Sequence, residues 1–307
     1  MPSRRVAPSR TLHPHEEQRR HPEAARSTKC FSRIWSYVIL TRPLNVLIGG
    51  LSIFVGALVT GTIQPLRHVL IACASGSLVA AGANAINDYF DLEIDRRNKP
   101  YRPLPAGKIT RRQAQVFALA LLLLGSVLGA AIGPVPLLVA TSTATLLYVY
   151  SWRLKRTVLW GNLVVSAATA LAFIYGGLAV GRPAAALIPA GFALLFHLGR
   201  EIIKDVEDMH GDRLEGAMTL PIRHGRRTAL MVATAVYALV VVVTPLPYLG
   251  GVYDLPYLLV VVAGVDTVVA YVVVQMWRQP DPSTLHRLSE LLKADMFVGL
   301  VAIYVGR

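Results

Sequence analysis

Two short stretches of the sequence carry acidic or amide side chains with the same spacing, 117 positions apart. The first acidic stretch holds Asn84, Asp88, Asp91 and Asp95, and the second acidic stretch holds Glu201, Asp205, Asp208 and Asp212. At about 100° per residue, positions i, i+4, i+7 and i+11 fall within an arc of roughly 60° on an α-helix. Each stretch therefore predicts a helix with one polar stripe. Glu93 and Glu207 fall off the stripes, so we expect them to be structural or to face loops.

These stripes favour divalent-cation chemistry over a solvated helix face, because unpaired carboxylates are costly in an apolar membrane protein. Hard oxygen ligands indicate Mg²⁺ rather than zinc or copper, and Mg²⁺ completes its shell with water and phosphate oxygens. Two facing stripes could therefore hold two ions with a diphosphate between them. The expected ligands are Asp88, Asp91 and Asp95 for one ion and Asp205, Asp208 and Asp212 for the other. The expected supporting ligands or orienting groups are Asn84, Asn87 and Glu201.

The elements that must position these side chains are apolar segments of membrane-spanning length. The chain has 307 residues, of which 54% are hydrophobic, and its mean hydropathy is +0.49. Runs near the roughly 20 residues that a bilayer crossing requires occur at 35–60, 67–90, 113–132, 135–151, 158–180, 184–208, 228–249, 255–277 and 286–306. We therefore expect an all-α integral membrane protein with nine transmembrane helices around a central cavity.

Basic residues indicate how these helices cross the membrane. The net charge is +13, and Lys and Arg cluster in the loops at 96–112, 152–157 and 209–228. The alternate loops carry little beyond Arg67 and Arg182. This alternation is the positive-inside pattern, which predicts a cytoplasmic N-terminus and places both acidic stretches at cytoplasmic helix ends. The basic surplus therefore indicates topology, and we expect no nucleic-acid partner.

The N-terminal segment, residues 1–33, is rich in Arg, His, Pro and Ser and lacks the apolar region of a secretory signal peptide. We expect it to be a disordered basic cytoplasmic tail, followed by one membrane domain at 34–307.

The similarity between the two halves extends beyond the acids. Leu104–Pro105 corresponds to Leu220–Pro221 after a one-residue slip, and Arg111–Arg112 corresponds to Arg226–Arg227. The two acidic helices are the second and sixth expected spans, so both run in the same direction. The sequence therefore predicts a parallel internal repeat whose pseudo-axis lies along the membrane normal. Two such helices can face each other across one cavity.

Cations close to the stripes are candidates for binding a diphosphate or a phosphorylated acceptor. These candidates are Arg42, Arg96, Lys155 and Lys204. Anchoring at the cytoplasmic membrane surface is the alternative role, and we favour it for Arg111, Arg112, Arg226 and Arg227.

The run from Asn87 to Asp95 resembles the NDxxDxxxD signature of UbiA-type intramembrane prenyltransferases, and Asp208 with Asp212 is similar to the DxxxD element of their second motif. The resemblance covers about residues 33–307. It implies Mg²⁺-dependent transfer of a prenyl group from its diphosphate to a lipid acceptor, in the cell membrane with the active site facing the cytoplasm.

Further runs resemble the archaeal-type digeranylgeranylglyceryl phosphate synthase branch: Thr41–Asn45, Tyr150–Arg156, Gly161–Asn162, Arg200–Asp208 and Thr219–Ile222. This resemblance implies geranylgeranyl transfer to geranylgeranylglyceryl phosphate in ether-lipid synthesis, and it adds Asn45 to the expected substrate-binding residues. An aromatic acceptor (4-hydroxybenzoate, a quinone precursor, chlorophyllide or haem) remains the alternative, and a secondary transporter is a remote one. Transporter sites lie near the membrane midplane, whereas these acids adjoin basic loops. The oligomeric state stays open.

Overall fold

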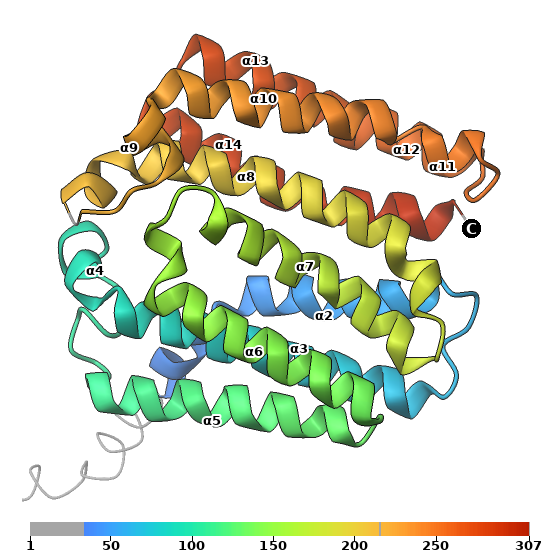
Figure 1. The fold of residues 1–307 in the computed structure, drawn as a ribbon, viewed down its shortest axis with the longest axis horizontal. Coiled ribbons are helices and arrows are strands. Elements are labelled where there is room, and N and C mark those ends of the chain that lie inside the picture. Colours follow the sequence, from blue (N-terminus) through green and yellow to red (C-terminus); the bar gives the residue numbers. More distant parts are fainter. Residues whose placement is uncertain (1–33, 215, 307) are drawn as a thin grey trace, which may run out of the picture.

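The computed structural model describes residues 34–214 and 216–306, and across these residues the protein is helical without strands (Figure 1). The predicted N-terminal tail lies outside the described residues. The longer helices are α2 (Pro43–Leu58), α3 (Leu66–Phe90), α5 (Arg111–Ala130), α6 (Pro134–Trp152), α7 (Trp160–Ala179), α8 (Leu187–Leu214), α10 (Arg226–Val243), α13 (Thr267–Arg278) and α14 (Pro282–Val305). The shorter elements are α4 (Leu92–Asn98), η2 (Leu154–Arg156), η3 (Pro183–Ala186), α9 (Leu220–His224), α11 (Leu246–Leu249), α12 (Leu255–Val260) and the π-helical η4 (Val261–Asp266).

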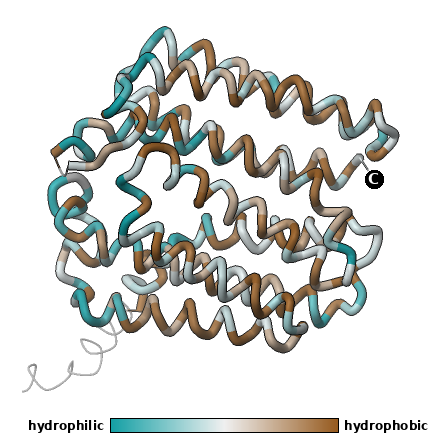
Figure 2. Tube along the Cα trace, viewed as in Figure 1, coloured by the Kyte–Doolittle hydropathy of each residue, from teal (hydrophilic) through white to brown (hydrophobic). Residues whose placement is uncertain are grey.

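The helices are long and apolar enough for a multi-pass membrane protein. Within the described residues seven helical segments meet that standard, and the number rises to eight if Ile34–Thr41 and α2 form one bent span. The predicted ninth span, 286–306, corresponds to α14, which is not among these segments. Polar residues gather at the helix ends, while much of the chain between them is apolar (Figure 2).

The predicted run 35–60 is a bent pair of helices that meet at 52°. Pro43 lacks an N–H group and disfavours a helical conformation in the residue before it. Arg42, at the break between the two helices, adopts a left-handed backbone with φ of 53°. Leu159, 117 positions later, has φ of 60° and precedes α7 in the same way. The two halves of the chain thus begin equivalent helices after a residue with positive φ.

Helices α2 and α7 touch backbone to backbone towards their C-terminal ends. A Cβ atom on Gly56 would lie 2.1 Å from the carbonyl oxygen of Phe173, and one on Gly176 would lie 1.9 Å from that of Ile53. Only glycine permits this approach, as at other close contacts between membrane helices. The contact closes the space between α2 and α7 at the end of the molecule opposite α4 and α9 (Figure 1).

Helices α3 and α8, which carry the two acidic stretches, run in the same direction and end near α4 and α9 (Figure 1). The first acidic stretch is interrupted at Asp91, where α3 gives way to α4. Backbone bonds nevertheless continue across the junction, from Asp91 N to Asn87 O at 2.9 Å and from Asp95 N to Asp91 O at 2.8 Å. The helical spacing assumed for the stripe therefore holds through Asp95.

Buried apolar side chains form a large cluster that joins α7, α8, α10 and the C-terminal helices, and a smaller one that joins α3 to α5. The two acidic helices belong to different clusters. A third cluster, which includes Val69, Ala72, Tyr175 and Ala179, joins α3 to α7.

Candidate active site

One cavity of about 760 Å³ lies between the helices of the two halves, within the range of roughly 300–1,000 Å³ typical of small-molecule sites. Its polar wall comprises Asn84, Asn87, Asp91, Asp95, Lys155, Glu201, Lys204, Asp205, Asp208 and Asp212, together with Arg42 and Asn45. Its apolar wall includes Ile53, Val139, Leu171 and Ala172, with Tyr175 among them. The structure thus brings both acidic stretches to one end of a shared cavity.

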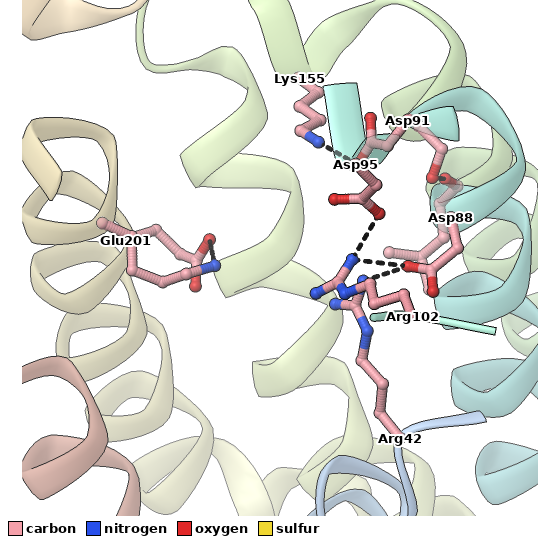
Figure 3. Close-up of polar contacts among 10 residues, drawn as sticks. Arg42, Asp88, Asp91, Asp95, Arg102, Lys155 and Glu201 are labelled. Atoms are coloured by element: carbon pink, nitrogen blue, oxygen red, sulfur yellow. Dashed lines mark hydrogen bonds and ion pairs between the residues drawn. The ribbon is translucent and has the colours of Figure 1, made fainter. Parts of the chain in front are cut away.

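The first acidic stretch is buried and paired with cations (Figure 3). Asp91 and Asp95 are 5% and 3% exposed. Lys155 donates to Asp91, and Arg102 Nη1 lies 2.7 Å from Asp95 Oδ2 and 3.1 Å from Asp88 Oδ1. Buried carboxylates require such partners, because an isolated charge away from water is strongly unfavourable.

Asp88 occupies a different position from the one expected for a metal ligand. It does not line the cavity, and it is 3% exposed. Arg42 Nη2 lies 2.5 Å from its Oδ1, which also accepts from Arg102. Asp88 lies at the edge of the roughly 60° stripe, so its carboxylate reaches these two arginines rather than the cavity.

Two asparagines of the first acidic stretch line the cavity. Asn84 Nδ2 donates to the carbonyl oxygen of Thr41 at 2.8 Å, which fixes the turn that presents Arg42. Asn87 Oδ1 is buried and has no hydrogen-bond partner among the described residues. An unpaired buried acceptor at a cavity wall needs an explanation, and a bound cation or its water would supply one.

The second acidic stretch is more open. Glu201 is 8% exposed and lies 3.1 Å from Arg200 Nη1, whereas Asp205 is half-buried and Asp208 is exposed. Asp205 Oδ2 accepts a hydrogen bond from Asn162 Nδ2 at 2.9 Å. A neutral amide therefore stands where the first acidic stretch has cations. Figure 3 shows Glu201 across an open space from the aspartates of the first stretch.

Three sequence expectations need correction or completion. Arg96 does not line the cavity; it pairs with Glu93 at 2.9 Å, and the two side chains are 57% and 74% exposed. Glu207 was expected to lie off the site, yet it lines the cavity and contacts His286 Nδ1 at 2.8 Å. Sequence reasoning missed Arg102, because it chose Arg96 as the phosphate-binding candidate of this basic loop. Its position seven residues after Asp95, in a proline-flanked loop, was the available hint.

Burial disfavours the charged forms of two side chains at the mouth of the cavity, Asp95 and Lys99. It raises the pKa of Asp95, while the neighbouring Arg102 acts in the opposite direction. Burial likewise lowers the pKa of Lys99, against the effect of Asp208. The polar end of the cavity is therefore a region of low effective polarity, in which opposite charges interact more strongly than in water.

The cavity wall offers hard oxygen donors that suit Mg²⁺. Among the described residues, however, no group of three or more His, Cys, Asp or Glu side chains is already arranged around one point. Arg42, Arg102 and Lys155 hold the carboxylates of the first stretch instead. The unpaired oxygen of Asn87 and the neighbouring Asp91 on the wall show that donors of the right chemistry are present.

Known proteins share this sequence and fold. The model of the UbiA prenyltransferase family matches residues 50–300. A digeranylgeranylglyceryl phosphate synthase of Methanothermobacter thermautotrophicus is 36% identical over 270 residues, which cover 88% of this chain and 95% of that protein. A solved structure of digeranylgeranylglyceryl phosphate synthase is 34% identical with a TM-score of 0.73, and the match covers 90% of this chain and 98% of that one.

A UbiA homolog from Archaeoglobus fulgidus, solved with DMAPP and Mg²⁺ bound, has the same fold with a TM-score of 0.65 at 22% identity, over 88% of this chain and 99% of that one. The extent of the family match and the high coverage of the relatives agree with the two acidic helices and their shared cavity. The chain belongs to the UbiA prenyltransferase family.

Proposed function

We propose that the protein transfers a geranylgeranyl group from its diphosphate to a glycerol hydroxyl of geranylgeranylglyceryl phosphate. The activity named for its 34–36% identical relatives supports this reaction. The observation that carries it is the cavity itself: buried acid–cation pairs at one end and an apolar wall beyond them. Such a cavity suits a molecule with an anionic head and a long apolar chain.

The donor diphosphate binds beside the first acidic stretch. Arg42, Arg102 and Lys155 turn from the aspartates to the phosphate oxygens, since a charge-assisted hydrogen bond can form with either partner. Mg²⁺, when bound, neutralises negative charge that develops on the departing diphosphate. The residues proposed to hold two ions are Asp91 and Asp95 with Asn87 on one wall, and Asp205, Asp208 and Asp212 on the other. Before the diphosphate binds, Asp88 holds Arg42 and Arg102 in position beside the cavity.

The isoprenoid chain lies along the apolar wall and keeps water from the reacting carbon. Tyr175 and Ile53 line that wall, and Tyr175 Oη forms a 2.9 Å hydrogen bond with Ser75 Oγ, so its hydroxyl is satisfied without water. In the reaction the bond between C1 of the prenyl chain and the diphosphate oxygen breaks. A bond from C1 to the glycerol oxygen forms, and the hydroxyl proton passes to water or to the released diphosphate.

The finer membrane arrangement is part of this proposal. Helix α14 serves as the ninth span, with Ser289, Glu290 and Lys293 towards the cavity and Val301 and Tyr304 exposed towards lipid. The loops rich in Lys and Arg lie at the end with α4 and α9 (Figure 1), which supports a cytoplasmic active site and N-terminus in the cell membrane. We also propose that residues 34–307 form one membrane domain and that this domain contains a parallel internal repeat.

The test is prenyl transfer by purified protein with labelled geranylgeranyl diphosphate and two acceptors, geranylgeranylglyceryl phosphate and 4-hydroxybenzoate. We expect an Mg²⁺-dependent ether product with the first acceptor only. A product with 4-hydroxybenzoate in place of the lipid would assign the protein to the aromatic-acceptor branch. Uptake of substrate into vesicles without any product would point to transport.

A further inference from the structure

A second group of cations lines the cavity on the wall opposite the first acidic stretch. It consists of Arg200 and Lys204 on α8 and Lys293 on α14. Figure 3 shows Glu201, which contacts this group, across the open space from Asp91 and Asp95. The reaction proposed above uses the cations of the first stretch for the donor and leaves this second group without a role.

The cations of this second group are held in place, but their hydrogen-bond donors are not all used. Arg200 Nε donates to the carbonyl oxygen of Ser289 at 3.1 Å, which ties α8 to α14. Lys204 Nζ lies 3.8 Å from Glu201 Oε2, and Lys293 Nζ lies 3.9 Å from Glu290 Oε2. Both distances exceed the usual hydrogen-bond length of about 3.2 Å. Each ammonium group therefore attracts its carboxylate while keeping donors available to another anion.

One part of this wall carries more cations than carboxylates. Among the described residues, the ion pairs of Arg200, Lys204 and Lys293 are with Glu201 and Glu290. Asp205 and Asp208 follow on α8 and line the same cavity, where they are the proposed Mg²⁺ ligands. The lysine side chains are 37% and 19% exposed, so both remain open to the cavity. With those aspartates bound to Mg²⁺, the three cations on this partly desolvated wall attract a phosphate more strongly than they would in bulk water.

Two phosphate-bearing substrates require separate anion sites, because their charges repel each other. We propose that Arg200, Lys204 and Lys293 bind the phosphate of the acceptor lipid. This inference rests on the proposed function and identifies the feature that selects a phosphorylated acceptor. With its phosphate on the α8–α14 wall and the donor diphosphate on the α3–α4 wall, the acceptor's glycerol lies between them, next to the donor's reactive carbon.

The test is a binding measurement that needs no turnover. Geranylgeranylglyceryl phosphate and its dephosphorylated alcohol are titrated into detergent-solubilised wild-type protein, Lys293→Met and Arg287→Met. Arg287 is exposed, lies on the same helix and does not line the cavity, so it is the matched control. We expect the wild type and Arg287→Met to prefer the phosphate form by about 10-fold or more, as a charged hydrogen bond can supply. Lys293→Met should lose most of that preference, and Lys293→Arg should restore it.

Thermal unfolding of each variant checks that it is folded, and Lys204→Met provides a second variant at the same wall. Equal affinity of the wild type for the two lipids, or an unchanged preference in folded Lys293→Met and Lys204→Met, would overturn the inference. Turnover is measured separately with the wild type. Phosphate-selective binding without product would refute the proposed reaction while supporting the binding site.

Discussion

The two acidic stretches have matching residues and contrasting surroundings. Asp88 contacts Arg42 and Arg102 and is 3% exposed. Its counterpart 117 positions later, Asp205, is half-buried and accepts a hydrogen bond from neutral Asn162. The position equivalent to Arg42 is Leu159, which has the same left-handed backbone but no charge. The backbone plan is repeated, and the charge arrangement is not.

This difference suggests a division of labour between the walls. In the first acidic stretch the aspartates are paired with cations. These cations can form hydrogen bonds with the phosphate oxygens instead when a diphosphate binds. In the second stretch Asp208 is exposed, and the cations Arg200 and Lys204 lie near Glu201 instead. A site for two different substrates needs such asymmetry, since two identical walls would bind the same ligand twice.

The largest expected effect comes from removing one carboxylate from each wall. We expect Asp91→Ala and Asp208→Ala each to lose prenyl transfer by on the order of 10²- to 10³-fold, the size of losing one charge-stabilising group. The measurement is turnover at saturating Mg²⁺ and donor. Wild-type-like turnover in either variant would show that its wall does not take part in the chemistry.

Removing Arg102 tests the paired state of the first stretch. Arg102→Met removes a cationic partner from Asp88 and Asp95, both of which are 3% exposed. Breaking a buried ion pair costs about 3–5 kcal/mol. Because Arg102 is itself 20% exposed, we expect a loss of unfolding free energy of about 2–4 kcal/mol. Denaturation in detergent measures it. Arg96→Met is the control, with an expected loss below about 1 kcal/mol for its exposed pair. Equal losses in the two variants would contradict the contrast in burial.

Removing Asn162 tests the neutral contact of the second stretch. Asn162→Ala deletes the hydrogen bond to Asp205, and we expect a loss of about 1–2 kcal/mol, smaller than that of Arg102→Met. The matched control is Asn45→Ala at the equivalent position 117 residues earlier; its side chain has no hydrogen bond to a carboxylate among the described residues. The same denaturation series reports both. A larger loss from Asn162→Ala than from Arg102→Met would reverse the comparison.

The smallest effect concerns α14, which lies beyond both halves of the repeat. Asp281 caps this helix, and its hydrogen bonds from Ser283 Oγ and Thr284 N lower its pKa below the usual 3.8. An acid whose pKa is lower in the folded protein contributes stability above its ordinary pKa and loses it as pH falls. The free energy of unfolding is measured from pH 6 downwards. In the wild type we expect a small decrease that begins near pH 4. In Asp281→Asn, which retains a capping side chain, this decrease should be absent. The same decrease in Asp281→Asn as in the wild type would exclude Asp281 as its source.

Helical periodicity and residue spacing predicted which acidic residues share a face, because they depend on local geometry. The stripe through Asp91 and Asp95 and its counterpart through Asp205 and Asp208 do line one cavity. Apolar runs located the helices, since each run is long enough to be recognised on its own. Hydrophobic length could not reveal the 52° bend at Arg42 or the π-helical turn in the predicted run 255–277. These features depend on how neighbouring helices pack.

Long-range contacts set the rest of the site. Arg102 approaches Asp88 from 14 residues farther along the chain, and Lys155 reaches Asp91 from a position 64 residues away. Asp88 has the same residue type and stripe as Asp91, yet it faces two arginines instead of the cavity. Spacing along one helix predicts which residues share a face, but it does not predict which partner each residue meets.

The glycine contact between α2 and α7 limits where the product can leave. Gly56 against Phe173 and Gly176 against Ile53 join the two helices backbone to backbone, so these ends cannot separate without breaking a close contact. Gly56 and Phe173 are themselves equivalent positions, 117 residues apart. A product with two apolar chains and one phosphate therefore finds no passage between α2 and α7 at that end. The finished lipid must therefore leave past other helices or through the end of the cavity that carries the acidic stretches.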